Sequence, residues 1–162
     1  MQKHIGIQTN DWRSVLADLP AKQRSEFHKE FNRCREDFLD TCHGQCVLRR
    51  RELAEIVADS LLHFDGQRYR MGDFIVMPNH VHLLVSFPSE ESLSDQCDSW
   101  LHYTARQINL KLGRKGKFWQ QEPFDHLVRS EVQYDYLRRY IRDNGRKAGL
   151  VEDHYLYRKY EG

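Results

Sequence analysis

The alternation of apolar and polar positions predicts a β-hairpin near the middle of the chain. Two runs rich in apolar and β-branched residues, 68–77 and 80–87, are separated by Pro78-Asn79, a dipeptide typical of turns. We therefore expect two antiparallel strands at the centre of a sheet. On the second strand, alternate residues are apolar and share one face.

Three amphipathic helices are predicted around this hairpin. Residues 51–63 and 93–112 place apolar side chains at i, i+3 and i+4, which gives each segment one apolar face. A third helix is expected from residue 131 to about residue 144, because Ser130 and Gln133 have the spacing of an N-terminal capping box. Gly145 is its expected C-terminal cap. Weaker patterns predict a strand at 3–9, a helix at 22–41 and a short strand at 124–129.

Length and composition favour one globular unit. The chain has 162 residues, of which 40% are hydrophobic and 30% charged, so we expect a single domain over residues 1–162. The order of elements predicts an α+β fold in which helices pack on an antiparallel sheet. No apolar run approaches the roughly 20 residues of a membrane span, and the first residues lack the profile of a signal peptide. We therefore expect no membrane role and a cytoplasmic location.

Charge is balanced overall but uneven along the chain. The 25 Lys and Arg residues against 24 Asp and Glu give a net charge of +1, so bulk charge does not indicate a nucleic-acid partner. Local basic runs do occur, at 49–51 and in a segment that leads into Phe118-Trp119. The basic residues of that segment are Arg106, Lys111, Arg114, Lys115 and Lys117. Taken alone, such runs are by default solvated helix ends and loop tips. If they bind nucleic acid, the basic residues would neutralise phosphates while Trp119 stacks on a base, although it is nearly as consistent that Trp119 fills the core beside the sheet.

Candidate chemistry centres on His80 and His82, at the start of the second strand. Residues i and i+2 of a strand share a face, so both imidazoles are predicted to project from the same side. A His-x-His pair in an arbitrary protein is more often incidental than a ligand site. Because both histidines would project from a rigid hairpin, our hypothesis is that they bind a metal.

Tyr140 and Asn144 form the second candidate pair, since a spacing of four residues places them on one helical face. A phenol has a pKa of about 10 and needs a metal, a base or an activated electrophile to react at neutral pH. A divalent cation bound by His80, His82 and the amide oxygen of Asn144 would activate a phosphodiester for in-line attack by Tyr140. Alternatively, Tyr140 is a residue at the edge of the core. Tyr136 is a competing nucleophile that lacks an amide four residues later.

Several motifs along the chain together resemble the REP-associated tyrosine transposases, of the single-tyrosine HUH transposase superfamily. The similarity covers about residues 42–151, and its motifs occur in the family's order. They are VMPNHVHLLV at 76–85, GKFWQ at 116–120, FDH at 124–126 with Arg129, Tyr140-Ile141 with Asn144, and KAGLV at 147–151. The resemblance implies a ferredoxin-like sheet with the HUH pair on a central strand and a nucleophilic tyrosine on a C-terminal helix.

The resemblance also implies a function and residue roles. The family cleaves and rejoins single-stranded DNA near palindromic hairpins, through a 5′-phosphotyrosine link, with a divalent metal such as Mg²⁺ or Mn²⁺. Carried over to this chain, His80, His82 and Asn144 are the metal ligands, Tyr140 is the nucleophile and Arg129 is a DNA contact. The expected partner is single-stranded or hairpin DNA, bound by a monomer or a homodimer.

The chain departs from the family pattern at two places, one before and one after Tyr140. The family usually has Asn-Pro where this chain has Asn144-Gly145, and a glycine is expected to hold the backbone less firmly than a proline. In many relatives a lysine follows the tryptophan at position 100, where this chain has Leu101. Two other functions therefore stay open: a hairpin-binding protein that no longer cleaves DNA, and a metal-dependent nuclease that uses water instead of Tyr140.

Overall fold

A computed structural model of the chain describes residues 20, 22, 46–119 and 127–160. The chain divides into two units, residues 1–41 and 42–162, and the fold below concerns the second unit alone. The expectation of one domain over residues 1–162 stays a prediction. The strand predicted at 3–9 and nearly all of the helix predicted at 22–41 lie outside the described residues.

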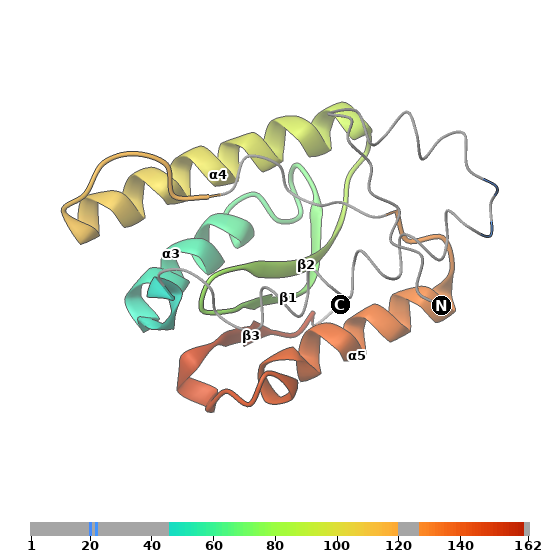
Figure 1. Cartoon of the computed structure of the whole chain (residues 1–162). Coiled ribbons are helices and arrows are strands. Elements are labelled where there is room, and N and C mark those ends of the chain that lie inside the picture. Colours follow the sequence, from blue (N-terminus) through green and yellow to red (C-terminus); the bar gives the residue numbers. More distant parts are fainter. Residues whose placement is uncertain (1–19, 21, 23–45, 120–126, 161–162) are drawn as a thin grey trace. The chain divides into compact units, whose positions relative to one another are not determined.

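The second unit is an α+β fold, as predicted, with an antiparallel sheet between helices (Figure 1). Its elements in chain order are η1 (Val47–Arg49), α3 (Arg51–Leu62), β1 (Arg70–Val76), β2 (Val81–Ser86), α4 (Glu90–Leu112), α5 (Glu131–Lys147), η2 (Glu152–His154) and β3 (Leu156–Arg158). The hairpin and the three helices around it are confirmed, with ends that move by a few residues. Local signals set these elements, so the sequence was sufficient to find them.

The ends of the long helices have defined caps. Ser89 begins α4 by accepting a hydrogen bond from the Ser92 N–H at 3.2 Å, and Gly113 ends it in the left-handed region at φ 63°. Ser130 begins α5 in the same way, because its Oγ accepts from the Gln133 N–H at 3.2 Å. The predicted N-cap at Ser130 is therefore confirmed, while the side chain of Gln133 accepts from the Arg129 N–H at 2.8 Å instead of from that of Ser130.

The sheet has the order β2-β1-β3 among the described strands, and both pairings are antiparallel. His82 lies on β2, and the expectation that the histidine pair lies on a central strand stays a prediction, because residues 1–19 and 23–45 lie outside the described residues. Of the three described strands the central one is β1, because β3, a three-residue strand near the C-terminus, pairs with the side of β1 opposite β2. Nothing in its short, charged surroundings predicted it.

A β-bulge at Gly72-Asp73 decides which side chains of β1 face each side of the sheet. The register shifts there by one residue, between the pairs Met71↔Val85 and Phe74↔Leu83. As a result, Met71 and Phe74 both join the same cluster although they are three positions apart. A Cβ on Gly72 would lie 3.0 Å from the Leu84 carbonyl oxygen, so a side chain here would force the neighbouring strand to shift by a few tenths of an ångström.

Two apolar clusters cover the two faces of the sheet. The larger cluster joins α3 and α4 to one face, and it includes Leu53, Phe74, Trp100 and Ile108. The smaller cluster lies between the other face and α5; its buried members are Ile75, Met77, Leu84 and Ile141. Figure 1 shows α3 and α4 on one side of the sheet and α5 on the other. Among the described residues, no helix is both long and apolar enough to cross a membrane.

The C-terminal end of α5 corrects the expectation for Gly145. The helix runs past this residue to Lys147, and the residue with positive φ that follows the helix is Gly149, at 68°. Gly145 is instead buried inside the helix, where a Cβ would lie 2.6 Å from Cζ of Tyr155. The Tyr155 ring therefore packs directly on the helix backbone. Gly145 permits a close approach rather than loosening the chain.

The short strand predicted at 124–129 is not found in its described part. Residues 127–129 form no strand, and residues 124–126 lie outside the described residues. In this described part Leu127 is 71% exposed, whereas Val128 is partly buried against the smaller apolar cluster.

Candidate active site

The two histidines converge at the start of β2. His80 immediately precedes the strand and His82 is its second residue, paired across the sheet with Ile75. The tight turn before them is closed by a hydrogen bond from the Met77 N–H to the His80 carbonyl at 2.8 Å. The Nε2 atoms of the two rings are 3.1 Å apart, and the ring centroids are 4.7 Å apart. Two ligands of a single ion, each about 2 Å from it, have this spacing when they meet at about a right angle.

Asn79 orients the first imidazole. Its Oδ1 lies 2.7 Å from Nδ1 of His80, and an amide oxygen can only accept, so Nδ1 carries the proton in this contact. The neutral His80 ring then has its lone pair on Nε2, the atom that faces His82. Metal-ligating histidines commonly donate their second ring N–H to such an acceptor, which fixes the tautomer. His80 is 9% exposed, so this arrangement is largely shielded from water.

Helix α5 brings Tyr140 to the histidines. The Tyr140 ring meets the His82 ring edge-on, with centroids 5.5 Å apart and an interplanar angle of 79°. Tyr140 is half-buried against the smaller apolar cluster, which holds this face of α5 on the sheet. The sequence therefore led to a residue that the fold places next to the pair.

Asn144 follows Tyr140 by one helical turn and is 2% exposed. Its Oδ1 is one of two buried side-chain polar atoms with no hydrogen-bond partner among the described residues. A buried acceptor without a partner costs about 1–3 kcal/mol, so an unsatisfied amide here calls for an explanation. A cation at the site would satisfy it, and two imidazoles with one amide oxygen are a suitable donor set for Mn²⁺. These residues therefore fit a divalent metal.

Tyr136 is placed differently from Tyr140. It lies one turn nearer the start of α5 and is 60% exposed, so its ring points into solvent. The ring in contact with His82 belongs to Tyr140.

Lys147 is a charged neighbour of the site that the sequence did not single out for a role. Its Nζ lies 5.4 Å from the centroid of the Tyr140 ring, within the range of a cation–π contact. The spacing of seven residues between Tyr140 and Lys147 returns to the same helical face, which is the signal that could have found it.

The predicted DNA-binding residues differ in how exposed they are. Arg106, Lys111, Lys115, Lys117 and Arg129 are exposed, whereas Arg114 is half-buried and donates to Asn109 Oδ1 at 3.0 Å. Trp119 packs on the larger cluster of the sheet's other face, and its indole N–H donates to Thr104 Oγ1 at 2.8 Å. The structure thus holds Trp119 partly in the core, the alternative that its sequence context left open.

One comparison with known proteins is decisive. The sequence profile of the family described as "Transposase IS200 like" matches residues 49–144, more than half of the chain. The chain belongs to the IS200-like transposase family. The matched range contains α3, the hairpin with both histidines, α4 and the part of α5 that ends at Asn144. As an IS200-like transposase, the protein is a DNA-processing enzyme, and DNA is its substrate. No curated protein and no solved structure matches the chain.

Proposed function

We propose that this transposase is of the REP-associated type and that it cleaves and rejoins single-stranded DNA at palindromic hairpins. Tyr140 is the nucleophile, and His80, His82 and Asn144 hold the metal. The observation that carries the proposal is the contact between the Tyr140 ring and His82, beside the pair of Nε2 atoms 3.1 Å apart.

The proposed reaction exchanges one phosphodiester for another. The Tyr140 oxygen attacks the scissile phosphorus and forms a 5′-phosphotyrosine bond. The bond to the 3′ oxygen breaks, and that oxygen leaves as a free 3′-hydroxyl after taking up a proton, while the phenol loses one. A bound divalent metal would polarise the phosphate and offset charge on its equatorial oxygens. Because the new bond is again a phosphodiester, a second 3′-hydroxyl can reverse the step without nucleotide hydrolysis.

The chain's own residues prepare this step. Asn79 holds the His80 ring in the tautomer that leaves Nε2 free to bind. The smaller apolar cluster holds Tyr140 beside His82, which keeps the nucleophile close to its target and lowers the entropic cost of the attack. Lys147 adds positive charge beside the Tyr140 ring, where a phosphate would approach.

Denaturing gels with a labelled hairpin that has a single-stranded flank test the proposal. With Mn²⁺ present, the parent protein is expected to form a covalent adduct with the DNA, and Tyr140→Phe is expected to form none. Tyr136→Phe is the matched control and should keep the adduct. An adduct in Tyr140→Phe that disappears in Tyr136→Phe would move the nucleophile to Tyr136.

Two further outcomes would assign a different function. Cleavage of the DNA without any adduct would indicate a hydrolytic nuclease that uses water. Tight hairpin binding with neither cleavage nor adduct would indicate a binding protein that has lost the reaction. Undiminished cleavage by His80→Ala/His82→Ala would reject the metal role of the pair.

A further inference from the structure

Asp73 is a buried carboxylate that the proposed reaction does not use. It lies on the central strand β1 and is 2% exposed. The bulge at Gly72-Asp73 places it on the same side of β1 as Ile75 and Met77, facing α5. A charge in such a place is strongly unfavourable unless donors surround it.

Three donors from distant parts of the chain satisfy Asp73. Arg138 of α5 donates through Nε at 3.1 Å, the Tyr157 hydroxyl of β3 donates at 2.7 Å, and the Tyr160 N–H donates at 3.0 Å. These partners are 65, 84 and 87 residues away in sequence. Burial, together with the hydrogen bond to Asp73 and its charge, raises the pKa of Tyr157 to about 12, so its phenol remains a donor at neutral pH. Asp73 therefore joins β1, β3 and α5 by directional bonds.

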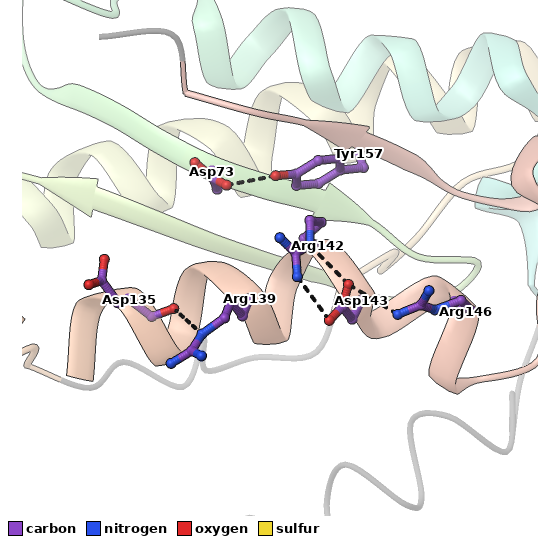
Figure 2. A network of polar contacts seen from close by, with 7 residues as sticks. All are labelled: Asp73, Asp135, Arg139, Arg142, Asp143, Arg146 and Tyr157. Carbon is purple, nitrogen blue, oxygen red and sulfur yellow. Dashed lines mark hydrogen bonds and ion pairs between the residues drawn. The ribbon is translucent and has the colours of Figure 1, made fainter. Parts of the chain in front are cut away.

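A second acidic residue, Asp143, offers a natural contrast (Figure 2). Asp143 pairs with Arg142 at 2.9 Å and with Arg146 at 3.5 Å, and all three residues belong to α5. Both arginines are more than half exposed. These pairs lie within one helix and cannot fix that helix against the sheet. The hydrogen bonds of Asp73 join different elements, so they can fix α5 against the sheet.

The position of Arg138 links Asp73 to the candidate active site. Arg138 precedes Tyr140 by two residues, and a helix turns by about 100° per residue, so the two side chains leave α5 on nearly opposite sides. Arg138 reaches Asp73 while Tyr140 meets His82. Apolar packing between α5 and the sheet is non-directional and tolerates a small rotation or slide of the helix. The bond to Asp73 does not tolerate it.

We propose that Asp73, through its bonds to Arg138 and Tyr157, is a positioning residue that fixes the rotation and register of α5 and so sets Tyr140 and Asn144 against the histidine pair. The consequence for the reaction rests on the proposed function. The consequence for metal binding rests only on Asn144 sharing a site with His80 and His82, and it can be measured without DNA.

The test compares Arg138→Met with the matched control Asp143→Asn, which removes an ion pair of α5 that does not reach the sheet. Mn²⁺ affinity is measured without DNA by electron paramagnetic resonance, at a temperature where circular dichroism shows each variant folded. Adduct formation is then measured in single turnovers with saturating DNA. We expect Arg138→Met to weaken Mn²⁺ binding and slow adduct formation by tenfold or more, with an unchanged Kd for DNA. Asp143→Asn should match the parent in both.

A conservative variant separates positioning from simple loss of stability. Arg138→Lys keeps a cation able to reach Asp73, so it should recover most of the Mn²⁺ affinity even if its melting temperature stays lowered. Asp73→Asn should behave like Arg138→Met, and if it fails to fold, Arg138→Met decides alone. Parent-like Mn²⁺ affinity in folded Arg138→Met would overturn the proposal. If the parent forms no adduct, the proposed function fails, whereas the Mn²⁺ measurement still decides the role of Asp73.

Discussion

The two faces of the sheet bury different kinds of side chain. Against α3 and α4 lies an apolar cluster in which Leu53 and Ile108 are fully buried and Phe74 is 1% exposed. Against α5, the part of the chain that the structure describes has four buried apolar residues, and with them the buried polar groups of Asp73 and Asn144. Apolar burial is the main source of stability, whereas a buried polar group without a partner lowers it. The face against α3 and α4 thus holds most of the apolar core, whereas the face against α5 combines a smaller apolar cluster with a bonded carboxylate, Asp73, and the amide of Asn144.

Phe74→Ala is the substitution expected to damage the apolar face most. Removing a fully buried phenylalanine lowers the free energy of unfolding by about 3–5 kcal/mol, because transfer energy is lost and a cavity remains. Tyr140→Phe, on the other face, should change it by less than about 1 kcal/mol while abolishing the adduct. Urea unfolding followed by circular dichroism measures both. If both variants lower the free energy of unfolding by the same amount, the two faces do not differ in their contributions to stability and to the reaction.

Metal binding should stabilise the polar face by a smaller amount. At a free Mn²⁺ concentration of about 100 times the Kd, a site present only in the folded state adds about 2.7 kcal/mol. Thermal unfolding with and without Mn²⁺ should show this gain in the parent and in the neighbouring control Asp143→Ala, but not in Asn144→Ala. Without metal, Asn144→Ala should cost little, because the oxygen that it removes has no hydrogen-bond partner among the described residues. An equal Mn²⁺ gain in Asn144→Ala would exclude this amide from the site.

The smallest effect on stability is expected in the basic loop after α4. Lys115→Glu changes an exposed residue, so the free energy of unfolding should move by less than about 0.5 kcal/mol. If Lys115 contacts DNA phosphates, binding of the single-stranded flank should weaken, and the slope of log affinity against log salt should become shallower by about 0.7. Lys159→Glu, at another exposed lysine, is the control and should leave the slope unchanged. If the salt slope of Lys115→Glu is unchanged, Lys115 does not contact DNA phosphates, and the basic run at 49–51 is the next surface to test.

Local signals predicted the elements that local interactions form. The apolar face of α3, the turn at Pro78-Asn79 and the Ser130 cap of α5 are each read from neighbouring residues, and each is confirmed. The short strand β3 could not be found in this way, because it exists only through its pairing with β1 across the chain.

The residues of the candidate site could be proposed from the sequence, but the contacts that surround them could not. The spacings of His80 with His82 and of Tyr140 with Asn144 led to residues of which His80, His82 and Tyr140 lie in contact, while their chemical roles stay predictions. The bulge that turns Asp73 toward α5 is a one-residue shift in strand register, and the alternation of apolar and polar residues in β1 does not predict it. The hydrogen bond from Trp119 to Thr104 likewise joins a loop to a helix, so the sequence left its burial open.

The contact between Gly145 and Tyr155 restricts how this sequence can evolve. A glycine inside a helix costs about 1 kcal/mol relative to alanine, yet a Cβ at position 145 would overlap the Tyr155 ring. Alanine, or the proline usual in the resembled family, therefore becomes acceptable only after the residue at 155 has become smaller. Substitution at position 145 thus depends on the side chain ten residues later, at position 155.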